Sequence, residues 1–365
     1  MELNLNLNLD QGLGLGLGLG LNMDAGVDVA AAEFPALALP GAAPRRDRRV
    51  PVPRACRHDG SAGAGEPIEA VRGAAVTAQG ASVHVRLPVV TGAPRLTAAR
   101  CELLREIDVV DAAGERRRIA IPAERPLTVF VDRRELVTLM TLGAMPEWLV
   151  LGYLCNQRLI DEVTEIESVT VDWDVGAAAV RTRGGLAHFE QRTASRVVTT
   201  GCGQGTVFGD LMAQAAALTL PDAAHARITQ DTLLAVLEAM RVRDSIHKRA
   251  GSVHGCALFQ GEQMLMAVED VGRHNAVDTI SGWMALHAVA GDDKVLYTTG
   301  RLTSEMVLKA ARIGVPIIVS RNGVTAMGHE MAQRLGMTLF GRAANRQFLC
   351  YCGAERFDAA PRARS

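Results

Sequence analysis

The sequence predicts an α/β protein whose second half is a three-layer α/β/α domain, preceded by a small α+β unit and a disordered N-terminal leader. Short β-type apolar runs alternate with helical patterns from residue 196 onward, an order that predicts right-handed βαβ crossovers. The 365 residues allow two or three domains of about 100–200 residues each, and 48% hydrophobic residues can fill a large core. Only 4% of the residues are aromatic, so we expect a mainly aliphatic core.

Composition divides the chain into four expected segments. They are a low-complexity leader over 1–102, the α+β unit over 103–194, the α/β domain over 195–357 and a flexible tail over 358–365. The leader begins with leucine alternating with asparagine or glycine and continues rich in Ala, Gly, Pro and Arg. Glycine and asparagine at every second position oppose strand formation, so we expect disorder. Arginines gathered between residues 45 and 54 leave a basic docking arm as the alternative.

The α+β unit is expected to contain strand pairs and one helix that begins near a proline suited to a first helical turn. These elements are the strands of 104–121 around a turn at Gly114, the hairpin 127–142 around residues 132–134, the helix Met145–Leu154, and the strand pair 165–171 and 177–183.

The α/β domain is expected to alternate strands with helices around a mostly parallel sheet covered on both faces. Its strands are expected at 196–200, 252–259, 264–270, 294–300, 315–320 and 337–341. Its helices are expected from about residue 208 and over 231–249, 274–288, 303–313 and 325–335. The helix over 231–249 has Thr229 or Asp231 available as its N-cap. Ligands of such sheets bind at the C-terminal ends of the strands.

The charge balance and hydropathy of the chain argue against two classes of function. With 39 Lys+Arg against 40 Asp+Glu, a net charge of −1 gives no reason to expect a nucleic-acid binder held by phosphate attraction. No apolar run reaches the roughly 18 residues of a membrane span, so we expect a soluble protein without membrane contact.

The seven cysteines indicate a reduced protein of the cytoplasm. Their number is odd and no secretion signal precedes them, so a disulfide framework is not expected. No pair has C-x-x-C spacing, which argues against common zinc-finger and thioredoxin-type sites, and we expect no structural metal. Cys350 and Cys352 alternate along an expected strand, so their side chains should share one face, as buried small side chains or as metal ligands with partners from elsewhere.

Cys202 is the candidate catalytic residue. It lies in the glycine-rich turn 201–205, between an expected strand and an expected helix. Neighbouring glycines leave the thiol accessible, and amides near a helix N-terminus favour the thiolate. The position therefore suits a nucleophilic or sulfur-carrying cysteine, although an inert small residue in a tight turn would have the same pattern.

A polar cluster over residues 269–278 is a second candidate site. It follows an expected strand and contains Arg273, which could bind an anion, and His274 and Asn275, which could orient a polar ligand. The alternative is a hydrogen-bonded helix cap with Asp270 or Asn275 as the capping residue.

Two glycine turns at successive strand ends are candidates for phosphate binding. The first contains Gly300 and Arg301, and the second spans residues 320–326. Free amides at a helix start bind anions, so together the turns could hold the two phosphates of a dinucleotide-like ligand. Ordinary βα turns capped by Thr303 and Thr325 remain the alternative.

Several ordered motifs over residues 104–355 resemble the FdhD family, the formate dehydrogenase accessory sulfurtransferases. They are ERPLTVFVDRRELVTLMTL, AVEDVGRHNAVD, TTGRLTSEMVLKAARIGVPIIVS and the segment Phe340–Gly353. The resemblance implies a cytidine-deaminase-like α/β domain without the deaminase zinc site. It also implies sulfur transfer from a cysteine desulfurase, as a cysteine persulfide, to the Mo-bis(molybdopterin guanine dinucleotide) cofactor of the formate dehydrogenase catalytic subunit, and a homodimer.

The family's persulfide cysteine opens a C-G-x-C-G loop, which reads Cys202-Gly203-Gln204-Gly205-Thr206 here. The resemblance therefore implies that Cys202 carries the persulfide. Gly205 replaces the second cysteine, which argues against an internal disulfide or a handover between two cysteines. The family's cofactor-binding segment, placed after the last strand, aligns loosely with Arg342, Ala343, Ala344, Asn345, Arg346 and Gln347.

Sulfur carriage is the function that these features favour, with cofactor phosphates on the two glycine turns, assisted by Arg273, Arg301 or Arg346. The alternative from another class is a chaperone that binds and delivers the cofactor without carrying sulfur. A guanine-nucleotide-binding regulator would use the same turns but would leave Cys202 without a role.

Overall fold

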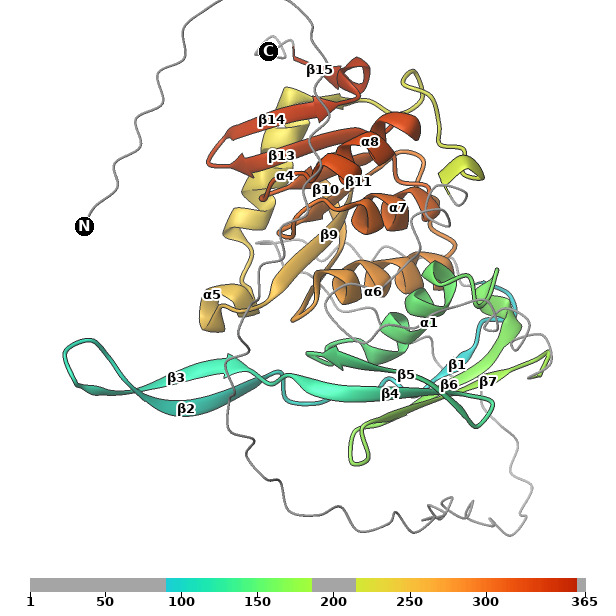
Figure 1. The fold of residues 1–365 in the computed structure, drawn as a ribbon, viewed down its shortest axis with the longest axis vertical. Helices are drawn as coiled ribbons and strands as arrows, with labels where there is room; N and C mark the ends of the chain where they lie inside the picture. Colours follow the sequence, from blue (N-terminus) through green and yellow to red (C-terminus); the bar gives the residue numbers. More distant parts are fainter. Residues whose placement is uncertain (1–89, 186–214, 360–365) are drawn as a thin grey trace, which may run out of the picture. The chain divides into compact units, whose positions relative to one another are not determined.

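The structure, a computed structural model, describes residues 90–185 and 215–359 (Figure 1). The expected strand 196–200, the turn with Cys202, the start of the following helix, and most of the expected leader and tail lie outside the described residues. No helix in the described ranges is both long enough and apolar enough to span a membrane.

Residues 90–185, here called the small unit, form a sheet with the order β1-β6-β7-β4-β5 and one helix, α1 (Pro146–Asn156) (Figure 1). The strands are β1 (Arg95–Leu96), β4 (Arg125–Val131), β5 (Arg134–Thr141), β6 (Ile166–Asp172) and β7 (Ala177–Thr182). Apolar side chains of α1 pack on the sheet in one buried cluster. The predicted strands and helix of this unit are confirmed.

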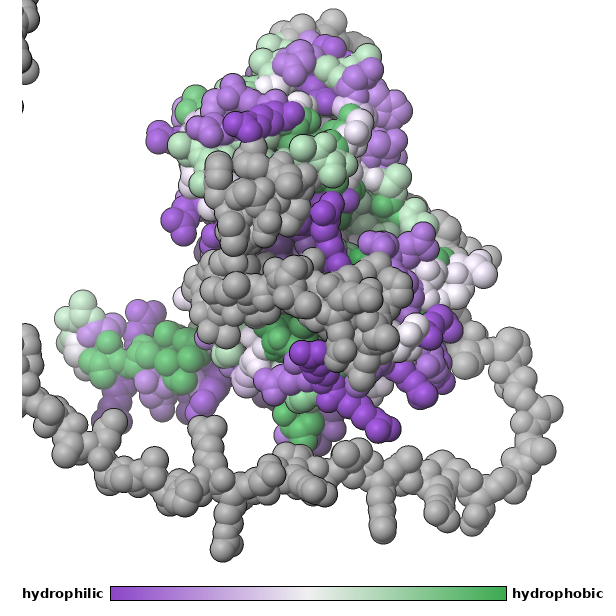
Figure 2. Space-filling view, turned by 45° about the vertical axis from the view of Figure 1, so that its right-hand side comes forward, coloured by the Kyte–Doolittle hydropathy of each residue, from purple (hydrophilic) through white to green (hydrophobic). Residues whose placement is uncertain are grey.

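A separate two-stranded sheet precedes β4. It consists of β2 (Leu104–Val110) and β3 (Arg116–Pro122), around the predicted turn at Gly114. Val110 is 66% exposed and Ile119 is 41% exposed, and Figure 2 shows hydrophobic residues gathered along this hairpin.

Local signals explain why the β4–β5 hairpin and α1 form where the sequence predicts them. The hairpin turns through Asp132 and Arg133, whose φ angles of 45° and 76° match the type I′ turn that suits the twist of a two-residue hairpin. Pro146 stands at the start of α1, where its missing N–H leaves no hydrogen bond unmade.

Order begins before Leu103, where the sequence places the end of the leader. Strand β1 pairs in parallel with β6. Beyond it, the Thr97 hydroxyl accepts the Val171 N–H at 2.8 Å, and the Ala99 N–H donates to the buried Glu147 carboxylate at 2.7 Å. All these partners lie far along the chain, so the local composition does not reveal them.

Residues 215–359, the large unit, contain a sheet with the order β10-β9-β11-β12-β13-β14. The strands are β9 (His254–Gln260), β10 (Gln263–Asp270), β11 (Lys294–Thr298), β12 (Ile317–Ser320), β13 (Thr338–Ala344) and β14 (Gln347–Cys352). The helices are α4 (Gln230–Val242), α5 (Ile246–Ala250), α6 (Arg273–Leu286), α7 (Ser304–Arg312) and α8 (Ala326–Arg334). A short pair, β8 (Ile228–Thr229) and β15 (Phe357–Asp358), and the 3-10 turns Val163–Glu165 and Ala354–Arg356 complete the described elements.

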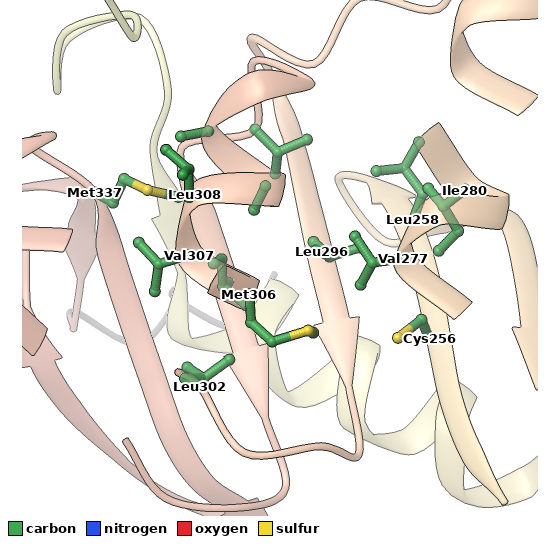
Figure 3. Packing of buried hydrophobic residues seen from close by; sticks show 14 of the residues in the cluster. Cys256, Leu258, Val277, Ile280, Leu296, Leu302, Met306, Val307, Leu308 and Met337 are labelled. Carbon is green, nitrogen blue, oxygen red and sulfur yellow. The ribbon is translucent and has the colours of Figure 1, made fainter. Parts of the chain in front are cut away.

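Two buried clusters make the large unit a three-layer α/β/α sandwich, which confirms the predicted fold class. Helices α6, α7 and α8 pack on one face of the sheet, where Leu258 and Leu296 meet Val277, Ile280 and other aliphatic side chains (Figure 3). Helix α4 covers the other face. The core is mainly aliphatic, as the low aromatic content predicts.

The sheet is mixed, which corrects the expectation of a mostly parallel sheet. The β11/β12 and β12/β13 pairs are parallel, whereas β10/β9, β9/β11 and β13/β14 are antiparallel. The two edge pairs, β9/β10 and β13/β14, are hairpins joined by short turns, which need no crossover helix.

The expected helix 231–249 is two helices. Helix α4 begins as predicted after Thr229, whose hydroxyl accepts the Thr232 N–H at 3.1 Å, but it ends at Val242. Ser245 adopts an extended conformation and caps the separate helix α5. The buried Glu269 carboxylate accepts the first N–H groups of α5, so a long-range contact sets this break.

Cys350 and Cys352 face opposite sides of the sheet, contrary to the expectation that they share one face. A β-bulge in the β13/β14 pair sets Leu339 opposite Cys352 but Phe340 opposite Cys350. The extra residue on β14 reverses the alternation, so Cys350 packs on the α4 side and Cys352 on the side of α6, α7 and α8.

Helices α1 and α6 cross at two glycines and join the two units. A Cβ atom on Gly152 would lie 1.7 Å from the Asp278 carbonyl oxygen, and one on Gly282 would lie 2.0 Å from the Trp148 carbonyl oxygen. Beside this crossing, Lys309 Nζ donates to both carboxylate oxygens of Asp278 at 2.7 and 2.6 Å. Asn156 Nδ2 of α1 donates to the same carboxylate at 2.7 Å.

Replacing Gly282 with alanine should destabilise the protein by about 2 kcal/mol or more, because the new methyl group overlaps α1 backbone. Urea unfolding checks this. Gly184→Ala is the matched control, since nothing lies within 4 Å of its Cβ position. Equal stability of the two variants would contradict the close crossing.

Lys309→Met should lower the free energy of unfolding by about 3–5 kcal/mol, because it leaves the buried Asp278 carboxylate without its cation. The double variant Asp278→Asn with Lys309→Met removes that charge but keeps an oxygen for Asn156. Thermal and urea unfolding should therefore show that the second change recovers a large part of the loss, and no recovery would contradict the reason given.

Candidate functional site

The candidate site lies at the edge of the large sheet where β11 and β12 end. Because β9 runs antiparallel to β11, and β10 antiparallel to β9, the start of β9 at His254 and the end of β10 at Asp270 lie at this same edge. Helices α6, α7 and α8 all begin here. The structure therefore brings together both predicted glycine turns and the predicted polar cluster.

Hydrogen bonds lock the two glycine turns to one another. The Ser320 hydroxyl at the end of β12 donates to the Gly300 carbonyl at 2.6 Å, and Asn322 Nδ2 donates to the Thr299 carbonyl at 2.8 Å. Leu302 and Val324 form a parallel bridge between the turns. The starts of α7 and α8 are therefore held side by side.

The alternative that Thr303 and Thr325 cap the two helices is confirmed for α8 and wrong for α7. The Thr325 hydroxyl accepts the Gly328 N–H at 3.2 Å and so caps α8. Thr303 stands at the N-cap of α7 without a side-chain cap hydrogen bond. Hence the start of α7 keeps backbone amides that its capping side chain does not occupy.

Gly300 makes room for the side chain of Arg273. A Cβ atom on Gly300 would lie 2.7 Å from Arg273 Cδ and 2.9 Å from Arg273 Cβ. The stem of Arg273, at the start of α6, thus packs directly on the turn that precedes α7. This contact brings two predicted residues together across two helices.

Positive charge gathers at this edge. Burial lowers the pKa of His254, and the charges of Arg273, His247 and Arg301 lower it further. Since like charges disfavour protonation, this shift indicates that the cations face one region. Arg301 is exposed, as a residue that meets a soluble anion should be.

His274 and Asn275 turn toward the protein interior. His274 Nε2 lies 3.3 Å from Glu305 Oε2 of α7. Asn275 Nδ2 donates to Asp270 at 2.9 Å and to the Met140 carbonyl of β5 at 2.7 Å. Their described contacts therefore connect elements of the protein, and the expectation that they orient a ligand finds no direct support in these contacts.

Asp270 is the buried acceptor of this region. Its carboxylate accepts the Thr141 hydroxyl at 2.5 Å, the Leu142 N–H at 3.1 Å and the Gly272 N–H at 3.0 Å. Burial raises the pKa of Asp270, and these hydrogen bonds oppose that rise. Asp270 therefore ties the small unit to the segment before α6. The alternative that Asp270 or Asn275 caps this helix is wrong, because Gly272 is the N-cap and no described side chain caps the first turn.

The segment from Arg342 to Gln347 is part of a β-hairpin, which corrects its placement after the last strand. Arg342 and Ala343 belong to β13, and Asn345 and Arg346 form the turn with φ angles of 49° and 65°. Ala343 is only 1% exposed, so its side chain belongs to the core. Arg342 remains near the site, because its N–H donates to the Asn322 carbonyl at 2.9 Å.

Arg346 lies close to α4. Its charge helps the hydrogen bond from Arg241 to lower the pKa of Glu238, which belongs to α4. Ala344 is half-buried, whereas Asn345, Arg346 and Gln347 are exposed. Within this segment, Arg342 is thus the residue that a described contact connects to the glycine turns.

Sequence reasoning missed Ser320 and Asn322 as the residues that join the two turns. The signal was the run Ser-Arg-Asn-Gly directly after a buried strand, since short polar side chains there bond to neighbouring backbone. In the two ranges that the structure describes, no group of three or more His, Cys, Asp or Glu side chains could hold a metal ion. Cys202 lies outside those ranges.

Known proteins resemble this chain in sequence and in structure. Residues 122–358 match the model of the FdhD/NarQ family. A protein of Bacillus pumilus (strain SAFR-032) named "Sulfur carrier protein FdhD" is 33% identical over 237 residues, which cover 64% of this chain and 88% of the relative. A protein of Bacillus subtilis (strain 168) with the same name is 32% identical, with the same coverage of 64% and 88%.

A crystal structure from Desulfotalea psychrophila, assigned as a formate dehydrogenase accessory protein, has a TM-score of 0.56 and 25% sequence identity. The match covers 70% of this chain and 98% of that one. The family match spans both described units, so it includes the linked turns and the polar cluster. The resemblance found in the sequence is thereby confirmed, and the chain belongs to the FdhD/NarQ family.

Proposed function

We propose that this chain is a sulfur carrier required for formate dehydrogenase activity. In this proposal Cys202 accepts persulfide sulfur from a cysteine desulfurase and passes it to the Mo-bis(molybdopterin guanine dinucleotide) cofactor of the formate dehydrogenase catalytic subunit. Relatives named sulfur carrier proteins support sulfur transfer in general, and the structural neighbour supports formate dehydrogenase as the client. A cytoplasmic homodimer is the form we expect to act.

The observation that carries the proposal is the pair of linked turns beside Arg273 and Arg301. A guanine dinucleotide contains a pyrophosphate, and helix-start amides with arginine side chains are the groups that bind one. Hydrogen bonds between the turns keep the two helix starts in place before any ligand arrives. Such preorganisation reduces the entropy lost on binding. The residues at this edge therefore suit the proposed substrate.

The sulfur step uses the thiolate of Cys202 as the nucleophile. The thiolate attacks the outer sulfur of the desulfurase persulfide, and the sulfur–sulfur bond to the desulfurase cysteine breaks. The desulfurase regains its thiolate, and Cys202 becomes a persulfide with no net oxidation or reduction. A single cysteine suffices for this exchange, which is consistent with Gly205 at the second position of the loop.

A cofactor chaperone that carries no sulfur is the second candidate. Gly205 favours it, because the family loop has a second cysteine there that this chain lacks. The linked turns would serve it equally well. The two functions differ in what Cys202 contributes, so substitutions at the turns and at Cys202 separate them.

Incubation with a cysteine desulfurase and cysteine should add at least one sulfur atom to Cys202. Intact and peptide mass spectrometry should localise the added mass to that residue, and a reductant should remove it. Cys202→Ala should abolish both the modification and the activation of formate dehydrogenase. The matched control is Cys101→Ser, because burial raises the pKa of the Cys101 thiol and makes it a poor nucleophile.

Full activation of formate dehydrogenase by Cys202→Ala would contradict sulfur carriage by this chain. If that variant stays active while Arg301→Ala is inactive, the chain acts as the cofactor chaperone. Loss of activity in both variants supports the carrier.

Arg301→Ala should weaken binding of guanosine diphosphate by about tenfold, because the variant loses a charge-assisted hydrogen bond to phosphate. Isothermal titration calorimetry measures this with the intact chain. Arg334→Ala is the matched control. Arg334 is the last residue of α8, whose first residue is at the site, so this variant should bind guanosine diphosphate as the wild type does. Equal binding by the Arg301 and Arg334 variants would exclude the turn as the phosphate site.

A further inference from the structure

A polar contact connects the first turns of α6 and α7. His274 Nε2 of α6 lies 3.3 Å from Glu305 Oε2 of α7, and the two side chains are 13% and 20% exposed. The geometry of this contact is not that of a hydrogen bond, and no described residue forms a hydrogen bond with His274 Nε2. The contact connects the helix that begins with Arg273 to the helix that follows Arg301.

The imidazole in this contact is neutral near pH 7. Burial, helped by the charges of Lys309 and Arg273, lowers the pKa of His274 to about 3. Burial also raises the pKa of Glu305. The two groups therefore meet as a neutral imidazole and a carboxyl group in a largely buried contact, and not as an ion pair.

A second contact joins the same helices one turn further on. Asp278 follows His274 by four residues, Lys309 follows Glu305 by four residues, and these two form the buried ion pair. Residues four apart lie on one helix face, so the two contacts form successive rungs between α6 and α7. The deeper contact, the ion pair, holds the two helices together. The contact at the sheet edge sets the relative position of their first turns.

The first turns of α6 and α7 determine where the cationic groups of the edge lie. Arg273 directly precedes His274, and its stem packs on Gly300. Glu305 follows the turn that contains Arg301. A shift between the first turns would therefore change the distance between the two arginines, and binding of a pyrophosphate depends strongly on such distances.

We propose that His274 and Glu305 are positioning residues, which hold Arg273 and the Gly300–Ser304 turn at the separation that a pyrophosphate requires. Neither side chain contacts the ligand in this proposal. The inference rests on the proposed function, because it concerns the anion-binding edge on which that function depends.

The test is a double-mutant cycle read by calorimetric binding of guanosine diphosphate to the full chain. His274→Phe and Glu305→Leu should each weaken binding about tenfold, and the double variant should lose no more than either single variant, because one contact is lost in all three. The melting temperature should change little. His274→Gln, whose amide can take the place of the imidazole nitrogen beside Glu305, should restore binding to within about threefold of wild type.

Controls make each outcome decisive. His287→Phe places the same change at the C-terminal end of α6 and should leave binding unaltered. If His274→Phe does not fold, His274→Asn replaces it, because the shorter side chain cannot span the contact to Glu305. This inference alone is overturned if His274→Phe binds the nucleotide as tightly as the wild type does. It is also overturned if the losses of affinity in the two single variants multiply in the double variant. A wild-type chain that does not bind the nucleotide would instead overturn the phosphate site itself.

Discussion

The buried ion pair between Asp278 and Lys309 is the interaction on which the arrangement of the two units depends. It joins α6 to α7 inside the large unit, and the same carboxylate accepts Asn156 from α1 of the small unit. Both charged side chains are almost fully buried, so neither charge is tolerable without the other. The pair thereby specifies one packing of three helices, and the close glycine crossing of α1 and α6 becomes possible beside it.

Elements that depend on local chemistry could be predicted from the sequence. The turn at Asp132 and Arg133, the start of α1 at Pro146 and the cap at Thr229 each follow from residues within a few positions. The mixed sheet and strand β1 could not, because partners distant in the sequence determine them. The expectation that Cys350 and Cys352 share one face is wrong for a similar reason, since pairing with β13 determines the bulge between them.

For the candidate site, the sequence indicates which segments meet but not which way their side chains point. The polar cluster and both glycine turns do gather at one sheet edge, because strand ends in a sheet of this kind share an edge. Within the cluster, Arg273 packs on the turn whereas His274 and Asn275 face inward. Helix phase relative to the sheet decides this, and only packing against α7 and β5 fixes that phase.

The distribution of charge is compatible with the proposed binding of an anionic cofactor by a chain of net charge −1. At a physiological Debye length of about 8 Å, distant charges hardly steer a ligand, so recognition depends on groups in contact with it. Burial lowers the pKa of His254, and the charges of Arg273, His247 and Arg301 at the site edge lower it further. In the interior, Glu305 lies beside His274, and Asp278 is paired with Lys309. Asp278 is thus neutralised by Lys309 inside the protein, so its charge does not offset that of the arginines at the edge.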